Sequence, residues 1–348
     1  MIHKPDMRRI SRRDFLKLGG LALAGLAFTP FLPETTQFDD IGLVRVAADS
    51  VSVYREPSDK SRIVRTWMRD DLVHIYDRIE VPTLGATPFW YRVFGGYMNA
   101  ARLQRVQVHY NVPLKSIPAT KQLMEVTVPF VQPYQYDLYH GWKPIWYRLY
   151  YSSTHWATGI DPGPDSRDWY TVQDEADKNT FFQVPMLPMR PVLPEEFSPI
   201  SPEIPLEQKR IEVNLSNQLL ECFEGDRVVF STAISSGVTG LYDTPMGRFN
   251  LMDKLPSRRM SAATSRYADD IILAGVPWTS FFTSEGVALH GTYWHDNFGF
   301  PMSHGCVNMR TEDARWVFRW SRPVAGYADI DKQTLDVKGY GTRVDVHY

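Results

Sequence analysis

The sequence predicts a mainly β protein built from several small domains. Short stretches in which apolar and polar residues alternate recur along most of the chain, and this period is typical of half-buried strands. Aromatic residues make up 13% of the 348 residues, and 25 residues are proline. Because this composition favours strands joined by ordered loops, we expect β modules rather than helical bundles. The length predicts two or three domains.

The first 40 residues have the organisation of an export signal. Residues 11–17 read Ser-Arg-Arg-Asp-Phe-Leu-Lys, and an apolar stretch follows from Leu18 to Leu32. This order is that of a signal peptide, and the first run matches the twin-arginine consensus. A stretch of this length, interrupted by glycines and a proline, is short for a membrane span. We therefore expect export to the cell envelope, the cell wall or the medium. Membrane contact is expected only through this segment, if it is not cleaved.

Residues 41–106 resemble a bacterial SH3-like module. Alternating segments occur at Val44–Val46, Val51–Arg55, Val64–Trp67, Leu72–Tyr76 and Phe89–Val93. A Glu-Pro-Ser-Asp turn follows the second of them, and a Gly-Gly-Tyr-Met segment closes the series. The resemblance implies a small β-barrel.

A second, diverged SH3-like module is predicted at 120–192. The aromatic segment Phe89–Val93 is similar in sequence to Asp168–Val172, and Ile145–Leu149 is predicted to be another aromatic strand. Tryptophan on an alternating strand is mostly buried, so the tryptophans of these segments are interpreted as core residues. Stacking of exposed rings on glycans is the alternative. The three residues are Trp90, Trp146 and Trp169.

Residues 193–208 are predicted to be a linker. Prolines recur through and just before this segment, at Pro188, Pro191, Pro194, Pro199, Pro202 and Pro205. Proline-rich segments are extended and semi-rigid. We expect this one to keep the modules and a catalytic domain at 209–348 apart at a defined reach.

The segment 303–308, Ser-His-Gly-Cys-Val-Asn, carries the clearest chemical signal in the chain. A thiol becomes a good nucleophile when a neighbouring imidazole takes its proton, so Cys306 is the candidate nucleophile and His290 the candidate proton acceptor and donor. His290 ends the alternating segment 286–290, which predicts a strand that delivers the ring to a sheet edge. The small Gly291 lets a backbone carbonyl reach the far ring nitrogen and fix the tautomer, the role of a triad's third member.

The residues after His304 are expected to complete the site and then to start a helix. Gly305 permits a backbone turn that other residues resist. Such a turn can aim the amides of Gly305 and Cys306 at one point, as an oxyanion hole. Thr311 is expected to be the N-cap of a helix, with Glu312 and Asp313 in its first turn.

A metal site and a cysteine peptidase are the chemical alternatives. Five side chains of types that bind zinc lie in this region: His290, His295, Asp296, His304 and Cys306. No Cys-x-x-Cys or helically spaced histidine pair occurs among them, so no metal is predicted. The histidine precedes the cysteine, which argues against papain-like peptidases. The other cysteine, Cys222, lies in an alternating segment and is expected to be a buried free thiol, as a disulfide to Cys306 would disable the nucleophile.

Four local patterns resemble the L,D-transpeptidase (YkuD-like) catalytic domain family across about 209–348. They are an opening hairpin at 211–220, Thr-Pro-Met-Gly-Arg-Phe at 244–249, Leu-His-Gly-Thr at 289–292 and Ser-His-Gly-Cys-Val-Asn at 303–308. The resemblance implies a β-rich catalytic fold that needs no cofactor.

The resemblance also implies a two-step acyl transfer on peptidoglycan stem peptides. Cys306 would attack the carbonyl of the third residue of a donor tetrapeptide, and the terminal D-alanine would leave. The side-chain amine of an acceptor stem would then resolve the thioester and give a 3→3 cross-link. His290 would act as base and then acid. Ser303, His304, Gly305 and Gly291 complete the expected catalytic group, with a purely structural role in the turn as the alternative for His304.

Five further residues are expected to bind the substrate or to line its pocket. They are Asn308, Arg310, Tyr293, Trp294 and Trp278. Asn308 is expected to hold the loop, and the guanidinium of Arg310 suits a substrate carboxylate. The aromatic residues are placed on the acceptor side. Packing of the loops is the alternative for the aromatic residues, and solvation at the surface is the alternative for Arg310.

Other functions stay open on the sequence alone. Hydrolysis of the same thioester would make the protein an L,D-carboxypeptidase, and the same nucleophile and base serve both reactions. A non-catalytic wall-binding protein and a zinc hydrolase are further alternatives. A net charge of −2 and the lack of a phosphate-binding glycine loop give no indication of a nucleic-acid partner.

Overall fold

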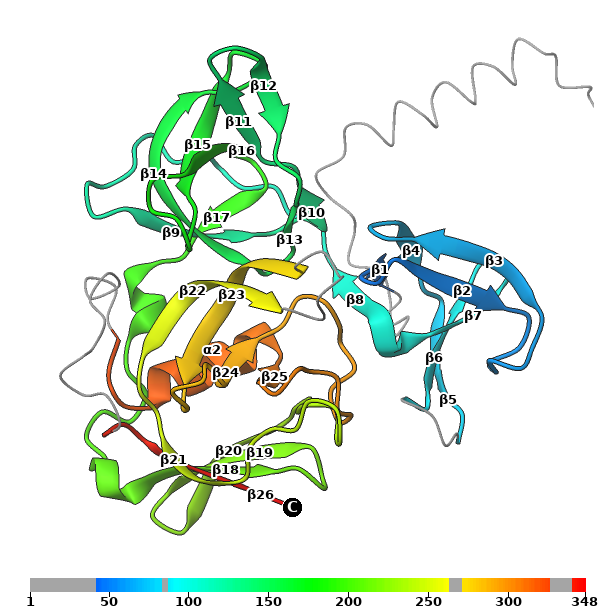
Figure 1. Cartoon of the computed structure of the whole chain (residues 1–348), viewed down its shortest axis with the longest axis vertical. Helices are drawn as coiled ribbons and strands as arrows, with labels where there is room; N and C mark the ends of the chain where they lie inside the picture. The colour runs from blue at the N-terminus through cyan, green and yellow to red at the C-terminus, as the bar shows by residue number, and fades with distance from the viewer. Residues whose placement is uncertain (1–41, 83–86, 263–270, 326–339) are drawn as a thin grey trace, which may run out of the picture. The chain divides into compact units, whose positions relative to one another are not determined.

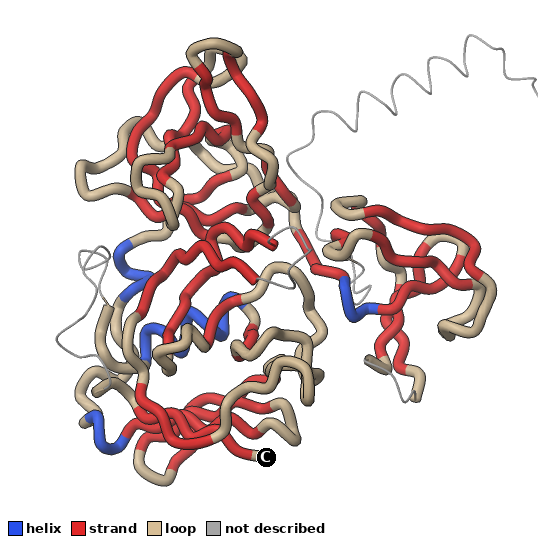
Figure 2. Tube along the Cα trace, viewed as in Figure 1, coloured by secondary structure: helices blue, strands red, loops and turns tan. Residues whose placement is uncertain are grey.

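The structure, a computed structural model, describes residues 42–82, 87–262, 271–325 and 340–348. This part of the chain is mainly β, as predicted, with the single α-helix α2 and three short 3-10 helices among the strands that it describes (Figure 1; Figure 2). The predicted export signal at 1–40 lies outside the described residues. No helix in the described ranges is long and apolar enough to cross a bilayer.

Each alternating segment predicted between 44 and 93 forms a strand. The elements are β1 (Leu43–Val46), β2 (Ser50–Tyr54), β3 (Ile63–Met68), β4 (Leu72–His74), β5 (Asp77–Glu80), β6 (Phe89–Val93), β7 (Gly96–Asn99), η1 (Ala100–Arg102) and β8 (Leu103–Val106). They pair in the orders β4-β1-β8 and β3-β2-β7-β6-β5. Side chains such as Val44, Val53, Tyr91 and Met98 fill the core of this module. Its assignment as an SH3-like module stays a prediction.

A larger antiparallel sheet follows. Its elements are β9 (Gln122–Val126), β10 (Phe130–Val131), β11 (Tyr134–Asp137), β12 (Gly141–Pro144), β13 (Leu149–Tyr150), β14 (Thr154–Pro162), β15 (Asp168–Gln173), β16 (Phe181–Pro185) and β17 (Met189–Pro191). The seven-stranded order is β12-β11-β16-β15-β14-β9-β17, and β10 pairs with β13. The core includes Met124, Tyr170, Val172 and Phe182. The relation of this sheet to the first module also stays a prediction.

The three tryptophans interpreted as core residues have different environments. Trp90 is buried, with 3% of its surface exposed, as predicted. The prediction for Trp146 is wrong, because 71% of its surface is exposed. Residues 145–148 form no strand, and β13 consists only of Leu149–Tyr150, so no alternation turns the ring inward. Trp169 is half-buried and meets the ring of Tyr134 edge-on.

Two sheets make up the part of the chain that was predicted to be the catalytic domain, here called the catalytic part. The first contains β18 (Lys209–Asn214), β19 (Leu219–Glu224), β20 (Arg227–Ala233), β21 (Gly247–Asn250) and β26 (Arg343–His347), in the order β20-β19-β18-β26-β21. The second contains β22 (Lys254–Ala262), β23 (Ile271–Phe281), β24 (Ala288–Gly291) and β25 (Val307–Met309), in that order. The pairs β18–β26 and β24–β25 are parallel.

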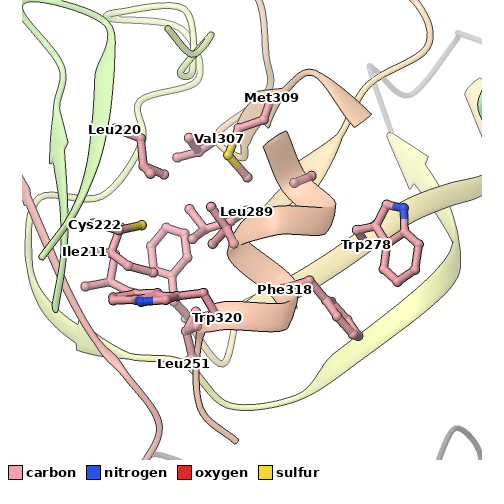
Figure 3. Close-up of a cluster of buried hydrophobic side chains, with 14 of the residues drawn as sticks. Ile211, Leu220, Cys222, Leu251, Trp278, Leu289, Val307, Met309, Phe318 and Trp320 are labelled. Atoms are coloured by element: carbon pink, nitrogen blue, oxygen red, sulfur yellow. The ribbon is translucent and has the colours of Figure 1, made fainter. Parts of the chain in front are cut away.

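The hydrophobic core of this part is shared by both sheets and by α2 (Thr311–Trp320) (Figure 3). Its buried side chains include Ile211, Leu220, Cys222, Trp278, Leu289, Val307, Phe318 and Trp320. The helix begins one residue earlier than predicted, since Arg310 rather than Thr311 occupies the N-cap position and makes no side-chain cap bond. The predicted acidic residues Glu312 and Asp313 do lie in its first turn.

Two buried lysines hold the C-terminal end of α2. Nζ of Lys254 donates to the carbonyls of Phe318, Ser321 (3.1 Å) and Pro323 (2.9 Å), and Nζ of Lys209 donates to Trp320 O at 2.9 Å. The last carbonyls of a helix lack partners within it and carry partial negative charge. The ammonium groups therefore stabilise the helix that directly follows the 303–308 segment.

The segment 193–208 contacts the catalytic part instead of extending away from it. Phe197, at the end of η2 (Pro194–Phe197), is buried with its ring centroid 5.1 Å from that of Trp278. Glu196 forms ion pairs with Arg190 and Arg315. The expectation of a spacer that keeps modules apart is therefore wrong for this segment, because its apolar side chains complete the core.

Candidate active site

The pairing of β24 with β25 places the strand of His290 beside the strand that follows Cys306. His290 lies opposite Asn308, and Leu289 lies opposite Val307. Cys306 directly precedes β25, and its Sγ lies 3.9 Å from Gly286 O, in the segment that leads into β24. Leu289 and Val307 belong to the hydrophobic core.

The tautomer of His290 is fixed by a backbone carbonyl. Its ring is buried, and Nδ1 lies 3.0 Å from Gly291 O. A carbonyl only accepts, so Nδ1 carries the hydrogen and Nε2 is left as a base. This is the geometry expected from the sequence. A glycine is required at 291, since a Cβ there would lie 2.8 Å from the Pro277 side chain and 3.1 Å from Thr311 Cα.

Burial keeps both reacting groups uncharged at rest. Burial lowers the pKa of His290 to about 4, opposed by its hydrogen bond to Gly291. Burial raises the pKa of the Cys306 thiol, opposed by a hydrogen bond from the Ala288 backbone. The pair is therefore a neutral thiol and a neutral imidazole at neutral pH. Such a pair works by proton transfer to His290 during attack rather than through a preformed ion pair.

Ser303 and Gly305 shape the turn that presents the thiol. Gly305 has a φ of +117°, a conformation that favours glycine, as predicted. Ser303 Oγ accepts from the Gly305 N–H at 3.0 Å and donates to the Cys306 carbonyl. The expected oxyanion hole is corrected in one respect: the Gly305 amide is already bound to Ser303. Of the two amides, only that of Cys306 makes no hydrogen bond to Ser303, so it is the remaining candidate donor to an oxyanion.

The sequence analysis did not identify the residues that hold the backbone of this turn in place. Thr244 Oγ1 donates to the Gly305 carbonyl at 2.8 Å and accepts from the Gly237 N–H at 2.9 Å. The Ser236 carbonyl accepts from the amides of Met302 and Ser303. The Thr-Pro-Met-Gly pattern at 244–247 was the available signal, because a buried hydroxyl before a turn usually has a backbone partner.

His304 and Arg310 are on the surface near the site. The His304 ring is exposed, and its centroid lies 4.1 Å from that of Tyr242. Arg310 lies over the Phe298 ring at 5.0 Å and is 3.6 Å from Asp313. His304 and Arg310 are both exposed, and Arg310 lies against the buried Phe298 ring.

Of the three aromatic residues predicted to line the pocket, one stays a candidate and two do not line it. Trp294 is half-buried, with its ring centroid 5.7 Å from that of His290, and stays a candidate. Trp278 is wrong as a pocket residue, because it is buried in the core against Phe318. Tyr293 is wrong as well, since its ring is buried and its hydroxyl donates to Ala274 O at 2.8 Å. Its carbonyl accepts from the buried Arg45.

The remaining expected groups are placed as follows. Asn308 is fully buried and exchanges both backbone hydrogen bonds with Ser235. Cys222 is a buried free thiol, as predicted, and burial raises its pKa. Across the described ranges, no group of three or more His, Cys, Asp or Glu side chains is arranged around a common metal position.

A comparison with protein families matches residues 208–346 to the YkuD family, described as the L,D-transpeptidase catalytic domain. The match covers less than half of the chain and includes both His290 and Cys306. Its bounds agree with the 209–348 predicted from the sequence patterns. A search of the curated proteins found no match.

Among solved structures, the chain is similar to several L,D-transpeptidases. An L,D-transpeptidase from Mycobacterium smegmatis is 17% identical, with 40% of this chain and 59% of that chain covered and a TM-score of 0.31. One from Stackebrandtia nassauensis is 23% identical, covering 40% and 56% with a TM-score of 0.27. The catalytic domain from E. faecium is 23% identical, covering 40% and 98% with a TM-score of 0.30. The similarity thus spans less than two thirds of the first two proteins.

Proposed function

We propose that this protein is an exported L,D-transpeptidase that forms 3→3 cross-links between peptidoglycan stem peptides through a thioester on Cys306. One observation carries the proposal: the hydrogen bond from His290 Nδ1 to Gly291 O leaves Nε2 as a base on β24, the strand that pairs with β25 directly after Cys306. The family match of residues 208–346 supports the same reaction class.

In the acylation step, Cys306 Sγ attacks the carbonyl carbon of the third stem residue and its proton passes to His290 Nε2. The C–N bond to D-alanine then breaks, and His290 returns the proton to the departing amine. In the second step the side-chain amine of an acceptor stem attacks the thioester, its proton passes to His290, and the thiol is regenerated. The Cys306 backbone N–H is the candidate donor to the oxyanion in both steps.

Hydrolysis of the same thioester is the alternative. Water in place of the acceptor amine would release a tripeptide and make the protein an L,D-carboxypeptidase. The half-buried Trp294 beside His290 supports transfer over hydrolysis, because an apolar wall next to the base limits the access of water. The non-catalytic alternative predicts neither product.

The test is mass spectrometry of defined tetrapeptide stems incubated with residues 42–348, which form one compact unit. A dimer one D-alanine lighter than two tetrapeptides supports transfer. Tripeptide alone indicates the carboxypeptidase, and unchanged stems contradict both. Cys306→Ala is the matched control and should give unchanged stems. A carbapenem is expected to add covalently to Cys306 and not to the buried Cys222.

A further inference from the structure

The loop that follows β24 is held by the catalytic part near both of its ends and by the first module, β1 to β8, in its middle. The Thr292 N–H donates to Met309 O at 3.0 Å, and the Gly299 N–H donates to Ile234 O at 2.7 Å. Trp294 lies between these two bonds in the chain. The residues on either side of it take hydrogen bonds from the first module.

Arg45, on β1, holds the backbone just before Trp294. Its Nη2 donates to the Tyr293 carbonyl at 2.9 Å. The guanidinium is itself fixed, because Nη1 pairs with Asp70 Oδ1 at 2.8 Å and Nε donates to Gln104 Oε1 at 3.1 Å. Only 1% of the surface of Arg45 is exposed. Since a peptide group is planar, a fixed Tyr293 carbonyl also fixes the backbone nitrogen of Trp294.

The first module also holds the backbone just after Trp294. The Asp296 N–H donates to Leu103 O at 3.1 Å, and the Arg105 N–H donates to the Asp296 carboxylate. Leu103 and Arg105 lie on β8, which pairs with β1, the strand of Arg45. One pair of strands therefore holds the loop on both sides of Trp294.

We propose that Arg45 is a positioning residue of the active site: together with the backbone of β8, it holds the loop so that the Trp294 ring packs against the His290 ring. The Trp294 ring is half-buried, and its centroid lies 5.7 Å from that of His290. A peptide group whose carbonyl loses its donor can turn, and the direction of the next side chain turns with it. The first module thus contributes to the site, although it lies outside the matched residues 208–346.

The consequence for His290 is its burial. Only 2% of its surface is exposed, and burial lowers its pKa to about 4. Release of the Trp294 ring would admit water to the imidazole, so this pKa should move toward its ordinary value of about 6.5. The effect on products rests on the proposed function, because a thioester beside an open base should be hydrolysed more often. The position of the indole does not depend on the substrate.

The first measurement is ¹⁹F NMR of residues 42–348 labelled with 5-fluorotryptophan, in which Trp294→Phe identifies the Trp294 signal by its loss. Arg45→Met keeps an apolar side chain and removes the donor to Tyr293. We expect the Trp294 signal to move toward that of free 5-fluorotryptophan. The signals of the buried Trp278 and Trp320 should stay in place and report an intact fold. An unmoved Trp294 signal in folded Arg45→Met protein overturns the proposal.

Arg148→Gln is the matched control. Nη1 of Arg148 pairs with Asp70 Oδ2 at 2.9 Å, so this variant removes another ion pair of the same carboxylate and leaves the bond from Arg45 to the loop. We expect the Trp294 signal of the unchanged protein. Equal movement of the signal in Arg45→Met and Arg148→Gln would show a general loosening around Asp70 and would overturn the positioning role.

The second measurement is the titration of the His290 ring, followed by NMR of protein with ¹⁵N-labelled histidine. We expect Arg45→Met to raise the pKa of His290 by about one unit or more, and Arg148→Gln to leave it unchanged. An unchanged His290 pKa in folded Arg45→Met protein contradicts the proposal. With tetrapeptide stems, the ratio of tripeptide to dimer should rise in Arg45→Met alone. Unchanged stems in every variant would contradict the proposed function, and the two NMR measurements would still decide the role of Arg45.

Two variants of Asp296 cover the case in which Arg45→Met does not fold. Asp296→Leu removes the acceptor of the Arg105 N–H, whereas Asp296→Asn keeps an oxygen that can accept it. We expect the Trp294 signal to move in Asp296→Leu and to keep its position in Asp296→Asn. The same signal position in folded Asp296→Leu protein as in the unchanged protein overturns the proposal.

Discussion

His155 and His290 are both buried histidines whose Nδ1 atom has an oxygen partner, yet their other surroundings differ. Nε2 of His155, on β14, lies 2.9 Å from Ser153 Oγ, and Nδ1 lies 2.7 Å from Glu175 Oε1. This is the order of partners in a serine, histidine and acid triad. His290 has the Gly291 carbonyl as its hydrogen-bond partner, and its strand pairs with the strand that follows Cys306. By partner type alone, the first group is the better match to a triad.

The difference lies in access to the nucleophile. Ser153 is fully buried, and its hydroxyl donates to Tyr150 O at 2.6 Å. The His155 ring lies so close to Gly275 that a Cβ there would be 2.2 Å from Cε1. Cys306, in contrast, is partly exposed after a glycine turn. The comparison shows that a set of catalytic residue types indicates an active site only where the nucleophilic atom is accessible to a substrate.

The largest expected effect is on turnover. Cys306→Ala should abolish acylation and every later product, because no other group can form the thioester. Ser153→Ala should leave the acylation rate within about twofold, since its hydroxyl serves only the buried network. Stopped assays with tetrapeptide stems measure both. Residual cross-linking by pure Cys306→Ala protein, or loss of acylation in folded Ser153→Ala protein, would reverse the comparison.

The next effect is on stability. In His155→Leu the Glu175 carboxylate, with 4% of its side chain exposed, loses its histidine partner. Breaking a buried pair on one side costs about 3–5 kcal/mol of unfolding free energy. Denaturant titration measures this loss, and acylation per folded molecule should not change. His290→Gln is the matched variant and should show the opposite pattern, with acylation lost and a smaller change in stability.

The third effect concerns pH. His290 has a folded pKa of about 4, below its ordinary value of about 6.5. Between these values the unfolded chain binds a proton that the folded protein does not, so the free energy of unfolding should fall on acidification through this range. Acylation should persist to about pH 5, because the base stays neutral until its folded pKa is reached. An acylation rate that already falls to half its maximum near pH 6.5 on acidification would contradict the claim that burial keeps His290 neutral.

The smallest effect is expected at the turn. Thr244→Val removes the hydroxyl that joins Gly237 to Gly305 and leaves the Gly305 carbonyl without this donor. We expect acylation to fall about tenfold, as the loss of one buried hydrogen bond of about 1.4 kcal/mol would give. Thr244→Ser keeps the hydroxyl and should retain most of the rate. Equal rates in the two variants would show that the turn holds without Thr244.

The parts of the site that depend on neighbouring residues could be predicted from the sequence. The presence of a strand at His290, the Gly291 carbonyl contact and the positive φ of Gly305 follow from alternation and glycine stereochemistry. The expected bounds and sheet edge were wrong, since β24 runs from Ala288 to Gly291 and lies between β23 and β25. Trp278 and Tyr293 could not be placed in this way, because their partners Phe318 and Ala274 meet them only in the folded core. The Thr244–Gly305 bond was missed for the same reason.

The fold shows the same limit. The mainly β class and the strands between 44 and 93 follow from local alternation. The contact of 193–208 with the catalytic core does not, because a proline-rich composition describes a stiff chain without saying what its apolar side chains meet. Phe197 is buried because its ring packs against Trp278 and Phe318. These three residues come from segments that are far apart in the sequence.

The most direct test of the central claim is to trap the acyl-enzyme. Protein mixed with a tetrapeptide donor whose side-chain amine is acetylated, so that it cannot act as acceptor, is quenched in acid within the first turnover, and its mass and peptide map are recorded. The account predicts an added tripeptide acyl group on the peptide that contains Cys306, and none in Cys306→Ala protein. Turnover with the acyl group on any other residue, or with no acyl group at any time, would contradict it.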